Sequence, residues 1–369
     1  MEKKSARPIA RRILVGGALA GVILGVTDGD EHRLPRPVTD YRQEFAEFFT
    51  PGSVGNANSR PLLNQEILDA QREYFLKNRE YLRQAYRDSR TVIDLGDRNF
   101  VASIVRGNSD AAVVSAAEYG NPLNRLGVVR HLGVRALVDP GAAAVYLPAN
   151  IHGQNNLNYS TDERGQLERG DSSPFTRRVE AALAYAGVRG AVHGYGISQS
   201  ADFMPAWAAC TDHDVQSLSL TETPFLEGQL APDSMLRVAL SSDRLEDYYK
   251  LSRQGITDEA LTNDGAFSLA DFVRGAMFDD DNRAMLSYMN ARQVEQDLGA
   301  FRTARPDAGL TMIWGGVSRV SPHRYNRAIA RQLGNDRAEY FEAYNADHVM
   351  TNAYAVVAAG ALRAKLLAA

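Results

Sequence analysis

The sequence predicts an α/β protein in which helices flank a mostly parallel β-sheet. Short apolar segments rich in Ala, Val and Leu recur along the chain, and segments with helical periodicity separate most of them. This alternation is typical of parallel strands joined by crossover helices. Most of these segments are also followed by loop-forming Gly, Ser, Asn or Pro residues. The predicted strands of the pattern are residues 111–117, 142–148, 191–195, 215–220, 310–314 and 339–344.

Length and composition narrow the function classes. At 369 residues the chain is long enough for one large domain with an insertion or for two domains. Its net charge of -4 is small and its basic residues form no stripe, which argues against nucleic-acid binding. Cys210 is the only cysteine, so we expect no intrachain disulfide and no cysteine-based metal site. No two histidines have the helical spacing of a zinc site, and we expect no metal or cofactor.

Residues 1–27 have the charge pattern of an export segment. Basic residues precede an apolar run over residues 13–26, and acidic residues follow it. This order predicts a signal anchor or a signal peptide, with the rest of the chain outside the cytoplasm. The run is shorter than the ~20 residues of a spanning helix, and no clear cleavage site follows it, so both alternatives stay open. Residues 28–60, which contain several prolines, are predicted to form a linker.

Residues 61–224 are predicted to form the first part of the α/β core. Besides its strands, this part contains a predicted long helix over 62–88, a hairpin of 91–95 with 100–105, and a helix at 125–132. In the helix that precedes residue 191, Ser173 is predicted as the N-cap and Pro174 as the first helical residue. Gly187 is predicted to end that helix.

Residues 225–303 interrupt the alternation and are predicted to form a helical insertion. Several helical patterns follow one another there without a convincing strand. Residues 279–282 (Asp-Asp-Asp-Asn) lack the alternating spacing and the glycine of a calcium loop, so we expect a helix N-cap there. The alternation resumes in residues 304–369, the predicted second part of the core, with helices at 322–333 and 352–367.

One serine has the surroundings of a nucleophile. Gly196 and Ser200 lie two residues before and after Ser198, between a predicted strand and a run of helix formers. A sharp strand-to-helix turn requires small residues at these two positions. The hydroxyl of Ser198 then lies at a helix N-terminus, where backbone N–H groups stabilise a developing oxyanion. On this motif alone, an ordinary strand–turn–helix remains the alternative.

The order of these elements resembles the α/β-hydrolase fold over roughly residues 91–369, with a helical cap between the sixth and seventh strands of the family. The resemblance implies that Ser198 is the nucleophile and that His348, just past the last predicted strand, is the general base. It also implies that the backbone N–H of Gln199 is one oxyanion donor. The loop Tyr119, Gly120 and Asn121 matches the second donor, with Asn121 as the most plausible group.

The residue that orients the histidine departs from the family pattern. The family usually places an Asp in the loop after its seventh strand, and the aligned residue here is Ser318. A serine orients an imidazole but does not offset its positive charge. We therefore expect Glu222, at the end of the preceding strand, to be the acid. Asp347 ranks lower, because side chains of neighbouring residues in an extended turn diverge from each other.

Two function hypotheses follow. The first is a serine hydrolase that cleaves a carboxylic ester of a small, apolar or lipid acyl compound. Apolar residues of the predicted cap either line its pocket or pack the cap against the core (Phe225, Tyr248, Tyr249, Phe267, Phe272, Met277 and Phe278). The second is a catalytically weak or inactive binding protein of the same fold, held at the membrane by residues 1–27. His193 and His213 are expected to be structural or surface residues, whereas His152 lies in a polar loop where a pocket role stays open.

Overall fold

The structure, a computed structural model, describes residues 62, 65–117, 125–148, 156–224, 279–289, 293–316, 318, 320, 321, 323–333, 336–343, 348 and 354–369. All of them belong to one compact unit that spans residues 40–369. The predicted anchor or signal and the whole of the predicted linker lie outside the described residues. Within the described ranges, no helix combines the length and the apolarity needed to cross a membrane.

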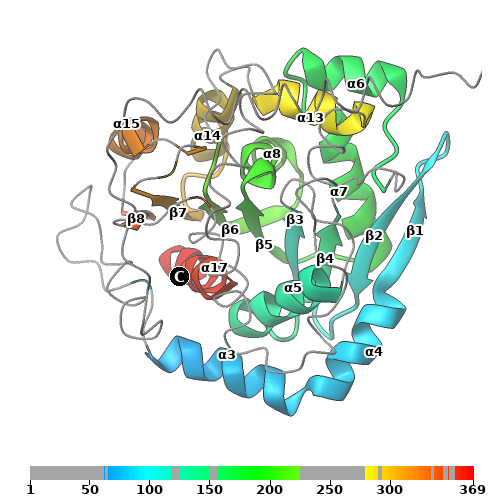
Figure 1. The fold of residues 1–369 in the computed structure, drawn as a ribbon, viewed down its shortest axis with the longest axis vertical. Coiled ribbons are helices and arrows are strands. Elements are labelled where there is room, and N and C mark those ends of the chain that lie inside the picture. The colour runs from blue at the N-terminus through cyan, green and yellow to red at the C-terminus, as the bar shows by residue number, and fades with distance from the viewer. Residues whose placement is uncertain are drawn as a thin grey trace, which may run out of the picture. The chain divides into compact units, whose positions relative to one another are not determined.

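An eight-stranded sheet forms the centre of the unit, with the strand order β1-β2-β4-β3-β5-β6-β7-β8 (Figure 1). The first two strands form the predicted antiparallel hairpin, and β2 pairs antiparallel with β4. From β4 to β8 in this order, all neighbouring strands pair in parallel. The strands are Arg90–Asp94, Asn99–Val105, Ala112–Ala116, Ala143–Leu147, Ala191–Ile197, Asp214–Thr221, Gly309–Gly315 and Ala338–Ala343. The mostly parallel sheet predicted from the sequence is thus confirmed.

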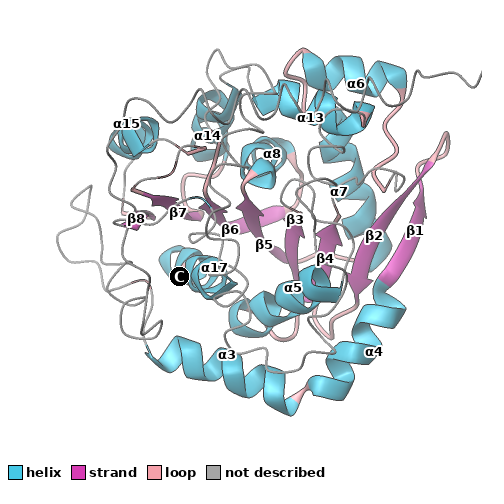
Figure 2. Ribbon diagram, viewed as in Figure 1, coloured by secondary structure: helices cyan, strands magenta, loops and turns pink. Residues whose placement is uncertain are grey.

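Helices cover both faces of this sheet (Figure 2). On one face, α5 (Arg125–Val138) packs on β3 and β4, and α17 (Tyr354–Ala368) packs on β5, β6 and β7. On the other face, α7 (Ser173–Ala186) packs on β2 and β4, α8 (Gln199–Cys210) packs on β5 and β6, and α15 (His323–Leu333) packs on β7 and β8. The buried apolar side chains accordingly form two clusters, one containing Trp207 and Trp314 and the other Leu132 and Tyr354.

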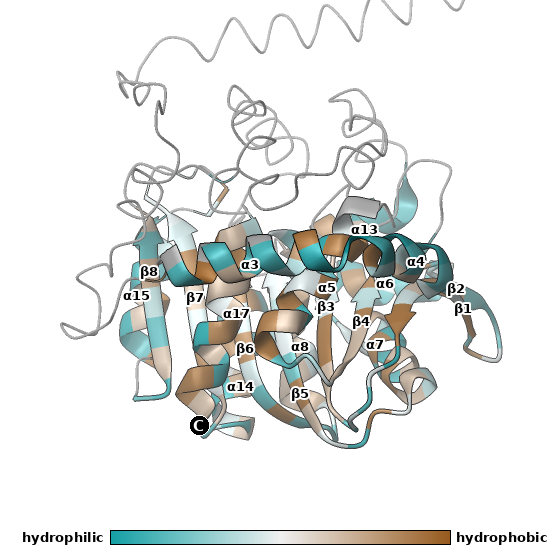
Figure 3. Cartoon of the chain, turned by 90° about the horizontal axis from the view of Figure 1, so that it is seen from below, coloured by the Kyte–Doolittle hydropathy of each residue, from teal (hydrophilic) through white to brown (hydrophobic). Residues whose placement is uncertain are grey.

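The predicted long helix over residues 62–88 is two helices, α3 (Gln65–Lys77) and α4 (Arg79–Ser89). Hydrophilic and hydrophobic bands alternate along α3 (Figure 3), as expected for a helix with one packed face. Asn78 separates the two helices, and its Nδ2 donates to the carbonyl of Tyr74 at 2.8 Å. A short amide side chain that bonds to nearby backbone competes with helix continuation, and this explains the break.

The ends of α7 differ from the prediction at one residue. The N-cap is Ser172 rather than Ser173, which is itself the first residue of the helix. Pro174 lies within the first turn, where its missing N–H removes no intrahelical hydrogen bond. Gly187 ends the helix in the left-handed conformation, with a φ of 77°, as the sequence predicts.

Two described helices lie between β6 and β7, α13 (Asp280–Met289) and α14 (Gln293–Ala304). Residues 225–278, including the aromatic residues assigned to the cap pocket, lie outside the described residues. Helix α14 packs directly on α8, and its Leu298 and Phe301 belong to the main core. The Oδ1 of Asp279 accepts the N–H of Asn282 at 3.0 Å, which is the predicted helix cap.

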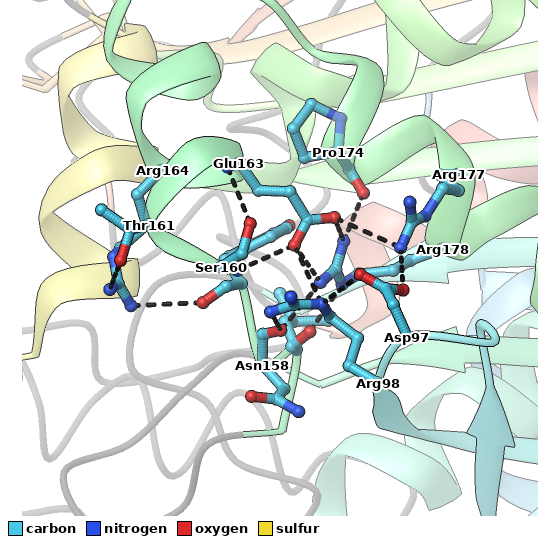
Figure 4. Close-up of polar contacts among 12 residues, drawn as sticks. Asp97, Arg98, Asn158, Ser160, Thr161, Glu163, Arg164, Pro174, Arg177 and Arg178 are labelled. Atoms are coloured by element: carbon cyan, nitrogen blue, oxygen red, sulfur yellow. Dashed lines mark hydrogen bonds and ion pairs between the residues drawn. The ribbon is translucent and has the colours of Figure 1, made fainter.

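A buried arginine binds the residues just before α6 (Figure 4). Arg178 has no exposed surface, and its guanidinium donates to both carboxylate oxygens of Glu163 at 2.8 and 3.0 Å. It also donates to the carbonyls of Leu157 and Asn158. Glu163 in turn closes a capping box with Ser160 at the start of α6 (Thr161–Glu168). One side chain therefore satisfies these two backbone carbonyls and the charge of Glu163 together.

Candidate active site

The turn between β5 and α8 has the geometry that a nucleophilic serine requires. Ser198 has a φ of 51° and a ψ of -123°, a backbone conformation that residues other than glycine rarely adopt. A Cβ on Gly196 would lie 2.7 Å from the Cα of Ala201, so no larger residue fits there. The N–H of Ser198 donates to the carbonyl of Thr221 at 2.9 Å and ties this turn to β6.

Ser200 replaces the second glycine of the common motif, and its hydroxyl fastens the same turn. Its Oγ donates to the carbonyl of Ile197 at 3.0 Å and lies 2.8 Å from the N–H of the same residue. The side chain is buried, with an exposed fraction of 1%. A small polar residue at this position therefore stabilises the turn instead of only avoiding a clash.

The structure brings His348 into contact with both Ser198 and Glu222. The Nε2 of His348 lies 3.0 Å from Ser198 Oγ, and its Nδ1 lies 2.9 Å from Glu222 Oε2. An ionised carboxylate only accepts hydrogen bonds, so Nδ1 carries the donated proton and Nε2 is the acceptor that faces the serine. All three side chains are buried, and a buried chain of hydrogen bonds is stronger than the same chain in water.

Glu222 is held by the strand that follows it in the sheet. It lies directly after β6 with a φ of 57°, and its N–H donates to the carbonyl of Ile313 on β7 at 2.8 Å. Its Oε1 accepts the N–H of Gly315, and its Oε2 accepts the hydroxyl of Ser318 at 2.7 Å. Ser318, which occupies the acid position of the family, therefore contacts Glu222, the carboxylate that lies beside the histidine instead.

The remaining predicted site residues are placed only in part. Gln199 is the first residue of α8, where a backbone N–H has no intrahelical acceptor and is available to an oxyanion. Tyr119, Gly120 and Asn121, the predicted second oxyanion loop, lie outside the described residues. The same holds for His152 and Asp347.

The other described histidines do not reach this site. His193 is buried with its Nδ1 2.9 Å from Ser217 Oγ, and burial lowers its pKa to about 4. The Nε2 of His213 lies 3.6 Å from a carboxylate oxygen of Glu180. The sequence did not single out His131, which is buried with its Nδ1 2.8 Å from the hydroxyl of Tyr195. Burial lowers the pKa of His131 to about 3.

Two features near the site were missed from the sequence. The first is the N–H of Gly315, which donates to the carboxylate of Glu222. The pair Gly315 and Gly316 at the end of a predicted strand was the sequence feature that indicated a backbone contact there. Asp202, one turn after Ser198 on α8, is fully buried. Within the described part of the chain, neither of its oxygens has a hydrogen-bond partner. Burial, followed by the charge of Asp297, raises the pKa of Asp202 well above its usual value.

Comparison with known proteins found similarity only among solved structures. No family model and no curated protein matches the sequence. Among solved structures, a bromoperoxidase from Bacillus anthracis is similar at 13% identity, with 72% of this chain and 95% of that chain covered and a TM-score of 0.47. A 2-hydroxy-6-oxo-6-phenylhexa-2,4-dienoate hydrolase from Rhodococcus is similar at 12% identity, over 72% and 93% of the two chains, with a TM-score of 0.46.

A putative lipase from Acinetobacter baumannii is similar at 15% identity, over 85% of this chain and 95% of that one, with a TM-score of 0.41. Likenesses at this level concern the arrangement of the chain and not its chemistry. The strand order, the helices on both faces and the serine turn after β5 together make this the α/β-hydrolase fold.

Proposed function

We propose that this protein is a serine hydrolase that cleaves a carboxylic ester through an acyl-enzyme on Ser198. The observation that carries the proposal is the hydrogen-bonded chain from Ser198 through His348 to Glu222, at the carboxyl ends of adjacent parallel strands. A serine hydroxyl is a weak nucleophile at neutral pH. A base within hydrogen-bond distance activates it by accepting its proton during the attack.

In the first half-reaction, Ser198 Oγ attacks the ester carbonyl while His348 Nε2 accepts the hydroxyl proton. The resulting tetrahedral oxyanion lies near the N-terminus of α8, where the N–H of Gln199 donates to it. The intermediate collapses with cleavage of the bond to the alcohol oxygen. The leaving alcohol takes the proton from the His348 imidazolium, and the acyl group stays on Ser198.

The second half-reaction repeats these steps with water. His348 Nε2 accepts a proton from the attacking water, and the new tetrahedral intermediate expels Ser198 Oγ, which regains its proton from the imidazolium. The products are a carboxylic acid and the free enzyme. Through both halves, Glu222 Oε2 holds the Nδ1 proton and offsets the charge of the imidazolium.

The proposed substrate is a small ester with an apolar acyl group. The support is compositional, because the sequence of the predicted cap contains many aromatic and apolar residues, and apolar pockets with few polar groups are typical of small-molecule sites. The competing hypothesis is an inactive binding protein, which rests on Ser318 at the acid position and on the N-terminal segment. Glu222 within hydrogen-bond distance of His348 favours the hydrolase over this alternative.

The test is labelling with a serine-reactive fluorophosphonate and turnover of a short p-nitrophenyl ester. We expect both in the wild type, loss of both in Ser198→Ala, and loss of turnover in His348→Ala. Ser217→Ala is the matched control, because Ser217 also contacts a buried histidine, His193, but lies away from this turn. Labelling that survives Ser198→Ala would remove the assignment.

We also propose that the catalytic unit is exported or held on the outer side of the cytoplasmic membrane by residues 1–27. The basic flank, apolar run and acidic exit of this segment support the proposal. Cell fractionation should find the full chain in the membrane fraction, or a mature chain that begins near residue 28 outside the cytoplasm. Full-length protein confined to the cytosol would contradict it.

A further inference from the structure

The carboxylate of Glu222 needs more than one contact to present a fixed oxygen to His348. The terminal torsion of a glutamate side chain has a broad distribution, so one hydrogen bond leaves the carboxylate free to rotate. In this site the Gly315 N–H holds Oε1, while Oε2 faces both Ser318 Oγ and His348 Nδ1. The oxygen that receives the histidine proton is therefore in direct contact with a serine hydroxyl.

The direction of that hydroxyl is determined by its other contacts. The Oγ of Ser318 accepts the N–H of Ser321 at 3.1 Å, and its backbone N–H donates to the carbonyl of Gly315 at 3.1 Å. Since a carboxylate only accepts, the hydroxyl proton of Ser318 lies on the 2.7 Å contact to Glu222 Oε2. With an exposed fraction of 7%, Ser318 has little access to water as a competing partner.

We propose that Ser318 is a positioning residue that fixes Oε2 of Glu222 against Nδ1 of His348. The inference rests on the proposed function, because it assigns Ser318 to the same hydrogen-bonded chain. Ser318 acts through Glu222 and not on the reacting atoms. The serine at the family's acid position thus contributes orientation, and the carboxylate from β6 contributes the charge.

The first experiment compares three variants in ester hydrolysis. Ser318→Ala should lower kcat about 10- to 100-fold with KM unchanged, because hydrogen bonds to a charged group are strong and this one acts on the base. Ser318→Thr keeps the hydroxyl and should restore most of the activity. Ser321→Ala is the matched control, since its Oγ contacts Asn326 while its backbone N–H to Ser318 is retained. Equal losses in Ser318→Ala and Ser321→Ala would overturn the proposal.

The second experiment is a double-mutant cycle with Glu222→Gln. If Ser318 acts through the carboxylate, Ser318→Ala should cause little further loss of kcat in the Glu222→Gln background. The same fold loss in both backgrounds would show that Ser318 supports the loop independently of Glu222, and would overturn the proposal.

A third readout does not depend on turnover and separates this inference from the proposed function. The Nδ1 proton of His348, bonded to a buried carboxylate, should give a low-field proton resonance that His348→Ala removes. We expect the resonance in the wild type, Ser318→Thr and Ser321→Ala, and its shift or loss in Ser318→Ala. An inactive wild type with this pattern would reject the hydrolase but keep the positioning role. An unchanged resonance in Ser318→Ala would reject the positioning role.

Discussion

Ser198 and Glu222 follow adjacent parallel strands, and both have a positive φ, of 51° and 57°. The N–H of Ser198 donates to the carbonyl of Thr221, the residue directly before Glu222. The N–H of Glu222 in turn donates to Ile313 on β7. The proposed nucleophile and acid are therefore fixed by one continuous set of strand-end hydrogen bonds, and their relative position depends on the sheet rather than on a surface loop.

Glu222→Gln should lower kcat by roughly 10⁴ while the protein remains folded, because the neutral amide no longer stabilises the imidazolium or selects its tautomer. Steady-state hydrolysis of a p-nitrophenyl ester measures the loss. Glu339→Gln is the control. Glu339 is also a buried glutamate, but it lies on the edge strand β8 and pairs with Arg363 of α17. A Glu222→Gln variant with near wild-type turnover would exclude Glu222 as the acid.

Gly196→Ala should destabilise the fold by about 1–3 kcal/mol and reduce turnover, because the new methyl group overlaps the backbone of Ala201 and Ser200. Denaturant unfolding together with the ester assay measures both effects. In Gly299→Ala the added methyl meets no atom within 4 Å. That control in α14 should gain roughly 0.5–1 kcal/mol from helix propensity.

Arg178→Ala should cost about 3–5 kcal/mol of stability, because it leaves the carboxylate of Glu163 buried without its main partner. Arg178→Lys should recover only part of the loss, since an ammonium does not reproduce the two-pronged contact. The neighbour Arg177 is about half exposed, so Arg177→Ala should change stability by at most about 1 kcal/mol. Equal effects of the two alanine variants would show that burial of the pair does not matter.

Asp202→Asn should become more stable than the wild type as the pH rises above about 4, the pKa of an aspartate in the unfolded chain. Burial raises the pKa of Asp202 in the folded state above its unfolded value, so the native state binds more protons than the unfolded state between the two values. The stability contributed by the protonated form is complete below the unfolded pKa and is lost as the pH rises toward the folded pKa. An Asn side chain has no such dependence.

Thermal unfolding across this pH range checks the Asp202 prediction. Asp212→Asn on the exposed turn before β6 serves as the control and should follow the wild type. Parallel stability curves for Asp202→Asn and the wild type would mean that Asp202 does not titrate in this way.

The strands were predictable because each is a short apolar run bounded by loop formers, and the order of strands and helices indicated the fold. The break at Asn78 was not predictable, because the apolar face continues across it and a side-chain contact with Tyr74 decides the outcome. Similarly, α14 carries the periodicity of any packed helix, and only its contact with α8 shows that it belongs to the core.

Sequence reasoning placed Glu222 near the histidine because it ends a strand beside the serine turn. It did not predict that Ser318 and Glu222 act on each other, since hydrogen bonds between separate loops leave no local pattern. The positive φ of Glu222 was not predictable either, because nothing about a glutamate in a sequence indicates such a backbone conformation. Gly187, in contrast, was predicted to end α7, since glycine favours that conformation.

The contact between Ser318 and Glu222 also limits which side chains fit at position 318. Ser318 Oγ and His348 Nδ1 meet at one atom, Oε2 of Glu222. A carboxylic acid in place of the Ser318 hydroxyl would put two like charges in one buried site, and one of them would stay protonated. Such a shared proton gives a neutral acid that still donates a hydrogen bond, which is the role of the serine hydroxyl here.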